Sequence, residues 1–262
     1  MSAGARPPSP SVDAVNASDS KDSGSRPDGR QSRWDQHKLE RRVAILDAAV
    51  AVLEEEPNAS EIHVQKIAER AGLMRTVVYR HFTDRADLDR AVQARILDML
   101  RVELAPEVKL SGSINDIIMR IVKTYVGWAA AHPALHRIAQ LEREGDAGPN
   151  ELQLAIQQIA DQVSGLFTLG AEVVGVQLSD DDRDALDPMI FGLVGQALGT
   201  VRYWLSRPEQ VPSAEVLARL MSDSIWFLVD GHARARGAVL DPSVPLDDLI
   251  AAAFIDGLPT ET

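Results

Sequence analysis

The chain has 262 residues, a formal net charge of -12 and no cysteine. This length is ample for a sizeable apolar core, and the lack of cysteine excludes a disulfide scaffold, a cysteine-ligated zinc site and a thiol nucleophile. Residues 1–30 hold no apolar signal segment, and no run of about 18 apolar residues follows, so we expect a cytoplasmic protein without a membrane partner.

The acidic residues are concentrated in the C-terminal part of the chain. Residues 105–262 hold 22 Asp and Glu against 11 Lys and Arg, whereas residues 30–104 hold 13 of each. Within the neutral part, residues 62–85 carry five basic and two acidic side chains. A locally basic segment on an acidic chain is compatible with nucleic-acid binding, and chance scatter of the charges is the alternative.

The first segment in chain order, residues 1–33, is rich in Ser, Pro, Gly and Asp and almost lacks large apolar residues. Such a segment buries too little to offset its ordering entropy, which predicts a disordered tail. From about residue 36 apolar residues recur at helical spacing, and we expect a helix that ends at Pro57.

Two short helices are predicted next. The first has apolar residues at i, i+3, i+4 and i+7 from Val64 and ends at Gly72, where a left-handed cap costs little. The second runs from Arg75 to Phe82, and Val78 and Phe82 share one face. Two short helices joined by such a turn predict a helix-turn-helix, whose second helix fits the major groove of B-DNA.

Helices continue to the end of the chain. A fourth begins near Thr83 and Asp84, which offer N-cap chemistry, and runs toward Pro106. The later ones are predicted at 113–131, 133–143, 150–175, 180–205, 213–236 and 245–256. Because Pro188 lies inside this pattern, its helix is expected to begin later or to bend. No alternating run indicates a strand, so the sequence predicts an all-α fold.

The helix-turn-helix segment and the helix before it contain a recognisable set of residues: Ile45-Leu46-Asp47-Ala48-Ala49, Ile67-Ala68-Glu69-Arg70-Ala71-Gly72-Leu73, Arg75, Val78-Tyr79-Arg80-His81-Phe82, Asp84-Arg85 and Leu88. Over residues 38–92 this set resembles the TetR family of bacterial regulators. The resemblance implies a three-helix DNA-binding domain at 34–85 and a helical ligand-binding and dimerisation domain at 86–257. It also implies a homodimer that represses transcription from a palindromic operator and is released by a small apolar effector, with lipid-like molecules as candidates.

Two positions depart from the family pattern. Met74 stands where the family has a small hydroxyl residue that caps the recognition helix, and methionine cannot cap. Val77 stands where the family has threonine, so a hydroxyl contact is lost and a contact to a thymine methyl becomes available. These departures bear on the operator sequence and not on the mode of binding.

Most of the predicted DNA-binding residues lie on or beside the second helix of the unit. Arg75, Thr76 and Val77 are expected to read bases, Arg75 through a bidentate guanine contact. The resemblance implies that Tyr79, His81 and Arg85 hold phosphates. The start of the fourth helix offers amides for another phosphate. The full set is Arg75, Thr76, Val77, Tyr79, Arg80, His81, Arg85 and Arg41, with Arg33 and Arg42 as further candidates. The alternatives are solvated charges and, for Tyr79, a core aromatic.

The helices at 180–205 and 213–236 are expected to form the dimer interface. Small residues let helices approach closely, and a twofold axis would double the pair into a four-helix contact. The predicted interface residues are Gly192, Gly195, Gly199, Leu217, Met221, Ile225 and Leu228. Packing within one chain is the alternative.

The remaining helices are expected to enclose an apolar effector pocket with a few polar groups. Its predicted lining is Tyr125, Trp128, His132, His136, Phe167, Tyr203 and Trp204. Ordinary core packing is the alternative for each. The effector would shift the dimer to a state that no longer matches the half-site spacing, with the fourth helix as the lever.

Catalysis and metal binding are the rival readings. His132 and His136 have a metal-ligand spacing, but Pro133 intervenes and no third ligand is evident. The sequence holds no glycine-rich phosphate loop and no nucleophile–base set. We therefore expect no enzyme activity, cofactor or metal, and keep a helical enzyme or an adaptor without specific DNA binding as the alternative function.

Overall fold

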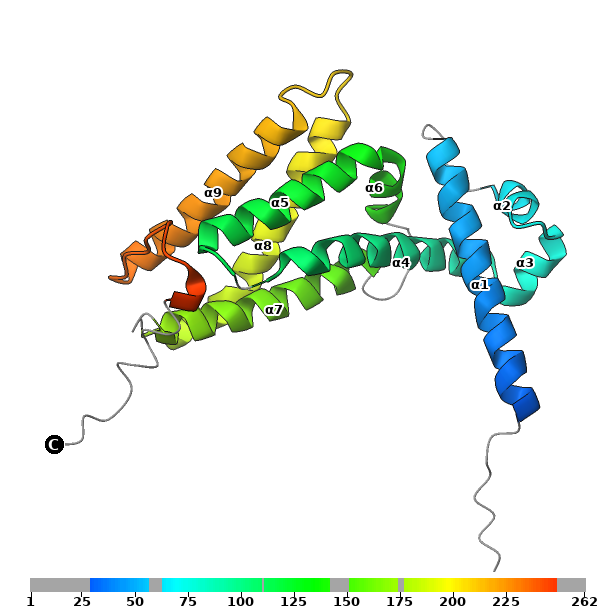
Figure 1. Ribbon diagram of the computed structural model, residues 1–262, viewed down its shortest axis with the longest axis horizontal. Coiled ribbons are helices and arrows are strands. Elements are labelled where there is room, and N and C mark those ends of the chain that lie inside the picture. Colours follow the sequence, from blue (N-terminus) through cyan, green and yellow to red (C-terminus); the bar gives the residue numbers. More distant parts are fainter. Residues whose placement is uncertain (1–28, 57–62, 110, 142–150, 174–176, 249–262) are drawn as a thin grey trace, which may run out of the picture. The chain divides into compact units, whose positions relative to one another are not determined.

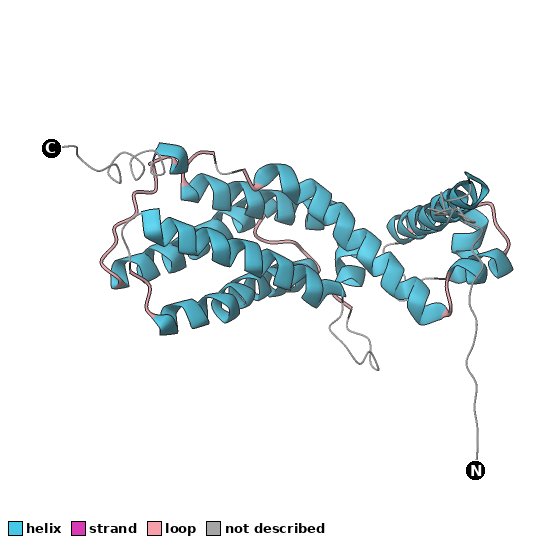
Figure 2. Cartoon of the chain, turned by 90° about the horizontal axis from the view of Figure 1, so that it is seen from below, coloured by secondary structure: helices cyan, strands magenta, loops and turns pink. Residues whose placement is uncertain are grey.

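The computed structural model describes residues 29–56, 63–109, 111–141, 151–173 and 177–248 (Figure 1). Every named element in these ranges is helical (Figure 2), which confirms the predicted all-α class. None of the described helices is long and apolar enough to cross a membrane. The α-helices are α1 (Gly29–Glu55), α2 (Val64–Arg70), α3 (Arg75–His81), α4 (Arg85–Leu104), α5 (Ile114–Ala131), α6 (Pro133–Ala139), α7 (Glu151–Val173), α8 (Asp180–Leu205) and α9 (Ala214–Ala235).

Several bounds differ from the predicted ones. Helix α1 begins at Gly29, so residues 29–33 are helical although they were assigned to the tail; arginine and glutamine in this stretch are good helix formers. Residues 1–28 lie outside the described part. Helix α8 begins at Asp180 and runs through Pro188. Most of the predicted helix at 245–256 lies outside the described residues.

Residues 1–40 and 41–262 form separate compact units. In the first unit, the described side chains from residue 33 onward are exposed, including Trp34 and Leu39. The ammonium of Lys38 lies 5.7 Å from the centre of the Trp34 ring, and Gln36 donates to Glu40 at 3.0 Å. These i,i+4 contacts support a solvent-exposed helical segment.

In the second unit, α1, α2, α3 and the start of α4 share a buried apolar core. It contains Ile45, Ala49, Leu53, Ile67, Ala68, Val78, Phe82, Leu88 and Val92. Helical spacing in the sequence identified Ile67, Ala68, Val78 and Phe82 of this core, because an amphipathic helix places its i, i+3 and i+4 positions on one face. The spacing did not single out Ile45 and Ala49 of α1.

The turn between α2 and α3 is fixed by its backbone. Gly72 has φ +65°, and its N–H donates to the Glu69 carbonyl at 3.1 Å, while the Leu73 N–H donates to the Ala68 carbonyl at 2.8 Å. This pair of bonds is a Schellman motif, which favours glycine at the left-handed position. The turn therefore ends α2 and directs the chain into α3.

The remaining helices pack in pairs, with α5 along α9 and α7 along α8 (Figure 1). Helix α4 contacts α5, α6 and α7. The starts of α5 and α8 carry capping boxes, formed by Ser113 with Asp116 and by Ser179 with Asp182, which satisfy amides of the first turns. Because α4 contacts three of these helices and also contributes to the core around α3, it links the two ends of the unit.

Candidate nucleic-acid interface

Helix α3 has one buried and one exposed face. Val78 and Phe82 are 0% and 1% exposed and pack in the core. Arg75, Thr76 and Arg80 are exposed on the remaining surface of the helix. Among the other predicted DNA-binding residues of this segment, Tyr79 is exposed, whereas Val77 and His81 are half-buried. One seven-residue helix thus brings six of the predicted residues together.

Arg75 and Tyr79 lie one helical turn apart and are in contact. The guanidinium carbon of Arg75 is 5.7 Å from the centre of the Tyr79 ring, within the range of a cation–π interaction. Tyr79 is 37% exposed, so it is not the core aromatic that was the alternative. The pair presents a cation over an aromatic ring on the open side of α3.

Arg42 of α1 holds the end of α3. Its Nη1 donates to the His81 carbonyl oxygen at 2.6 Å, and its guanidinium carbon lies 4.2 Å from the centre of the Phe82 ring. Arg42, a further candidate for a DNA contact, therefore also positions the end of α3. Its partner lies 39 positions away, so no local spacing identifies it.

The start of α4 is capped by carboxylates. Asp84 accepts a hydrogen bond from the Asp87 N–H at 2.8 Å, as its N-cap role predicts, and Asp87 accepts from the Thr83 N–H at 2.8 Å. The phosphate site that we expected from these amides is therefore disfavoured, because two anionic groups already lie there.

Arg85, predicted to hold a phosphate, is paired within α4. Its Nε lies 2.9 Å from both carboxylate oxygens of Asp89. The side chain is still 39% exposed, so the pair is a solvated one of modest energy that a phosphate can compete with. Arg41 is exposed on α1.

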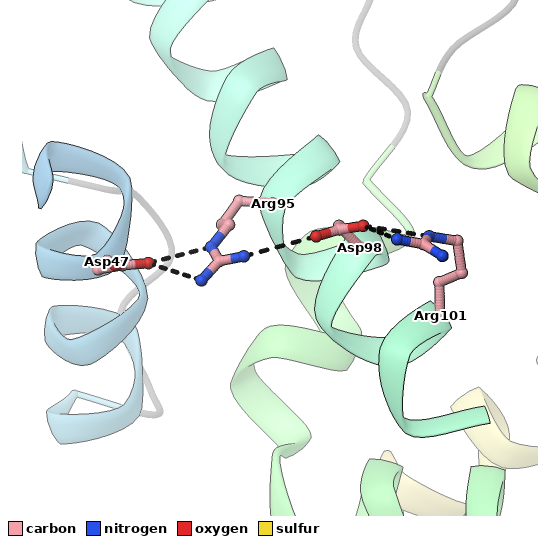
Figure 3. Close-up of polar contacts among 4 residues, drawn as sticks. All are labelled: Asp47, Arg95, Asp98 and Arg101. Atoms are coloured by element: carbon pink, nitrogen blue, oxygen red, sulfur yellow. Dashed lines mark hydrogen bonds and ion pairs between the residues drawn. The ribbon is translucent and has the colours of Figure 1, made fainter. Parts of the chain in front are cut away.

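A row of alternating charges links α1 to α4 (Figure 3). The Arg95 Nε lies 3.0 Å from Asp47 of α1, and its Nη1 lies 3.5 Å from Asp98 one turn further along α4. Asp98 also accepts from Arg101 at 2.7 Å. A second link joins Glu54 of α1 to His132 before α6, with 2.7 Å between carboxylate oxygen and Nδ1. These pairs connect the helix that supports α3 to the helices behind it.

The predicted effector residues differ in burial and in hydrogen-bond partners. Tyr125 and His136 do meet: the hydroxyl lies 2.8 Å from His136 Nε2, and the Gln140 amide nitrogen lies 2.8 Å from the same atom. Burial raises the pKa of Tyr125. Burial, with a smaller contribution from the positive charge of Arg202, lowers the pKa of His136 to about 4. This buried polar group is therefore neutral at pH 7.

Two of the other predicted effector residues, Trp128 and Trp204, share the buried core with Tyr125 but have contacts of their own. Trp128 is buried with its ring 5.4 Å from that of His132, and Trp204 is buried with its Nε1 donating to the Pro212 carbonyl at 2.9 Å. Tyr203 is 71% exposed, so its assignment to an interior pocket is wrong. It comes one position before the inward-facing Trp204, which turns its side chain by more than a quarter turn of α8. The Phe167 side chain lies outside the described part of the chain.

The predicted dimer residues divide between surface and core. Leu217 and Met221 are each only 8% exposed and belong to the core. Ile225 and Gly199 are half-buried, whereas Gly192, Gly195 and Leu228 are exposed. A groove of about 200 Å³ lies between α8 and α9. Its lining is Leu193, Gln196, Ala197, Thr200, Leu217, Leu220, Met221, Ser224 and Ile225.

The sequence did not single out Phe227, a large apolar residue three positions after the groove residue Ser224 on α9. Phe227 is 69% exposed, and Leu220, on the same helix, is 48% exposed. A Cβ added to Gly192, Gly195 or Gly199 would meet no atom of the chain within 4 Å. The surface of α8 and α9 is therefore open and partly apolar.

The two histidines considered as metal ligands have different partners. His132 pairs with Glu54, and His136 with Tyr125 and Gln140. Among the described residues no group of three His, Cys, Asp or Glu side chains is placed to hold a metal ion.

Comparison with known proteins agrees with the geometry of this interface. Residues 45–92 match the family model described as bacterial regulatory proteins, tetR family. The chain is 25% identical over 218 residues to an uncharacterized HTH-type transcriptional regulator of Mycobacterium tuberculosis, covering 81% of this chain and 87% of that protein. It is 34% identical over 83 residues to the HTH-type transcriptional repressor LfrR of Mycolicibacterium smegmatis, covering 32% and 42% of the two chains.

Solved structures share the fold. A tetR-family transcriptional regulator from Streptomyces coelicolor has a TM-score of 0.56 at 17% identity, over 85% of this chain and 91% of that one. The regulator FadR from Bacillus subtilis, solved with stearoyl-CoA, has a TM-score of 0.55 at 21% identity, over 72% and 98%. The relatives are transcriptional regulators and not enzymes. Residues 45–92 thus carry the DNA-binding domain of the TetR family of bacterial transcriptional regulators, and α2 and α3 are its helix-turn-helix.

Proposed function

We propose that the chain is a dimeric repressor that places α3 in the major groove of each half of a palindromic operator and is released by a small apolar effector. The observation that carries this proposal is that α3 has one buried face and one exposed face. Val78 and Phe82 are fully buried, while Arg75, Thr76 and Arg80 are exposed. A helix held by one face presents the other to base edges, and arginine is suited to guanine.

The open surface of α8 and α9 supports a dimer. Two half-sites lie about one turn of DNA apart, so reading both requires two recognition helices related by a twofold axis. Exposed Phe227 and Leu220 beside the α8–α9 groove offer apolar area for a second copy, and the glycines of α8 leave space for close approach of a helix.

The interior of the chain supports an apolar effector that carries a polar group. Apolar pockets use a few placed polar groups to orient a ligand, and the neutral Tyr125–His136–Gln140 group is such a set. FadR of Bacillus subtilis was solved with stearoyl-CoA, and its shared fold supports an effector with an acyl chain. The relative LfrR is a transcriptional repressor, which supports repression rather than activation.

Helix α4 is suited to carry the signal from effector to DNA. Buried Gln93 of α4 donates to the carbonyl of Ala139 at 2.8 Å, at the end of α6. Two residues further along α4, Arg95 pairs with Asp47 of α1. An effector that moves α6 relative to α4 would therefore bias the position of the helices around α3.

Genome-wide mapping of bound DNA followed by binding titrations tests the proposal. Once mapping has defined the operator, the unaltered chain and two variants are titrated with operator and random DNA at several salt concentrations. Arg75→Ala is expected to lose about 1–3 kcal/mol of discrimination for the operator. Arg85→Ala is expected to weaken binding to all DNA and to lower the salt dependence. Equal losses on operator and random DNA for both variants would contradict these roles.

A further inference from the structure

Two apolar side chains lie at the N-terminal edge of α3. Met74 is the N-cap residue; its side chain makes no capping hydrogen bond and is 72% exposed. Val77 follows three positions later, is half-buried, and donates its N–H to the Met74 carbonyl at 2.8 Å. Residues three apart lie on neighbouring positions of a helix surface, so the two side chains share one edge.

This edge weakens the helix without a visible gain inside the chain. A serine, threonine or aspartate at the N-cap would satisfy an amide of the first turn and contribute about 1 kcal/mol. A mostly exposed methionine recovers little free energy from burial in exchange. Residues that go against a local structural preference, with no compensating contact in the chain, are expected at binding sites. Met74 at the N-cap of α3 is such a residue.

The rest of the exposed surface of α3 is polar. Arg75 and Tyr79 form one flank, with the guanidinium over the ring, and Thr76 and Arg80 lie between that flank and Val77 by helical geometry. Met74 and Val77 therefore give α3 an apolar edge beside a row of hydrogen-bonding and charged groups.

The major groove offers a matching apolar group. Among the groups that base pairs display there, the C5-methyl of thymine is the apolar one. We infer that Met74 and Val77 form an apolar reading edge that contacts a thymine methyl in each half of the operator. The inference rests on the proposed placement of α3 and adds a base identity to it.

A deoxyuridine scan of the mapped operator tests the inference, because deoxyuridine pairs as thymine does but lacks the C5-methyl. The unaltered chain is expected to lose about three- to fivefold in affinity when the contacted thymine in a half-site is replaced, as for burial of one methyl group. Val77→Ala and Met74→Ser are expected to reduce or abolish this penalty at that position. Val102→Ala, which alters an exposed valine of α4, is the matched control and is expected to keep it.

The outcomes separate this inference from the proposed function. The reading edge would be overturned if no thymine replacement lowered the affinity. It would also be overturned if Val77→Ala and Met74→Ser both kept the full loss of affinity. In either case DNA binding itself would stand. An unaltered chain that does not distinguish the operator from random DNA would instead overturn the proposed function. Thermal unfolding checks the fold of the variants, and Met74→Ser is expected to unfold at the same or a higher temperature because serine caps.

Discussion

Arg42 shows how a single side chain fixes the position of the recognition helix. It donates to the His81 carbonyl at the end of α3 and stacks on Phe82, and its Nη2 lies 3.9 Å from Asp87 of α4. A cation near the C-terminal carbonyls of a helix is favourable because of the helix dipole. These contacts hold α3 from a residue that need not touch DNA.

Replacing Arg42 is therefore expected to lower stability and DNA affinity together. Arg42→Ala loses a charged hydrogen bond and a cation–π contact, which predicts a loss of about 1–2 kcal/mol in the free energy of unfolding. Urea unfolding followed by circular dichroism measures this loss. The neighbouring Arg41→Ala is the control, since Arg41 is exposed and its replacement is expected to change stability by less than about 0.5 kcal/mol. Equal stabilities for the two variants would contradict the positioning role.

At the residue scale the sequence predicted local features and missed distant ones. The turn at Gly72 and the N-cap at Asp84 were identified because their partners lie within five positions along the chain. The contacts of Arg42 with His81 and of Glu54 with His132 join residues 39 and 78 positions apart, and no periodicity in the sequence encodes such pairs. Tyr203 was misplaced for a related reason, because composition alone does not tell which side of α8 faces inward.

Among the elements, α5 and α6 are joined by a polar contact in an apolar setting. His136 of α6 is 3% exposed, and it contacts Tyr125 of α5 and Gln140 after α6. Such a group specifies how two helices meet only while its hydrogen bonds are satisfied. The protonation state of His136 therefore matters to the packing of both helices.

The free energy of unfolding of the chain is expected to decrease as the pH is lowered, because of His136. Its pKa is about 4 in the folded chain, against 6.5 for a histidine in an unfolded chain. Between these two pH values the unfolded chain therefore binds a proton that the folded chain does not. The stability that depends on neutral His136 is fully present above pH 6.5. It is lost as the pH falls toward 4, by an amount on the order of 2 kcal/mol.

Urea unfolding between pH 7 and pH 4.5 measures this dependence. His136→Gln removes the titrating group while keeping a side chain that can bond to Tyr125, so the variant is expected to show a flatter pH dependence. All other ionisable groups are the same in the two proteins. A variant whose stability falls as steeply as that of the unaltered chain would rule out His136 as the source.

The pair of Asp47 and Arg95 provides a measurable link between α1 and α4. Both side chains are partly exposed, at 51% and 33%, so a double-mutant cycle with Asp47→Asn and Arg95→Gln is expected to give a coupling of about 0.3–1 kcal/mol. Salt at about 1 M should reduce the coupling by screening. A coupling of zero at low salt would mean that this contact does not join the helices energetically.

Elements were predicted well where periodicity is long and strong. The bounds of α8 agree with the predicted 180–205, and those of α5, α7 and α9 agree within two residues at each end. The start of α1 was missed because residues 29–33 lack the apolar periodicity that marks a packed helix, although their intrinsic preferences permit one.

At the scale of the whole molecule, the proposed function depends on joining two copies, and α8 and α9 form the proposed interface. The sequence predicted the two helices but not which of their faces is open: Leu217 and Met221 pack inward, while Phe227 and Leu220 point outward. Both faces of α9 are rich in apolar residues, so the pattern alone could not separate core from interface. The exposure of Phe227 and Leu220 identifies the open side.

A charge placed on this open side is expected to prevent dimerisation. Phe227→Glu would bury a carboxylate in the contact, which is costly without a partner, and sedimentation velocity should show a shift toward monomer. Loss of the second recognition helix should lower operator affinity by at least about tenfold. Val102→Glu places the same charge at a 57% exposed valine of α4 and serves as the control. If both variants remain dimers with equal affinity, the interface lies elsewhere.

The account depends above all on the exposed side of α3 lying against base edges, and disulfide crosslinking to DNA measures this directly. The chain has no cysteine, so Thr76→Cys introduces one thiol on α3 and Glu103→Cys introduces one at an exposed position of α4. Operator DNA carrying a thiol tether on a cytosine in the major groove is then offered to each variant. The account predicts rapid crosslinking of Thr76→Cys within each half-site and none of Glu103→Cys. Equal crosslinking of the two variants would contradict it.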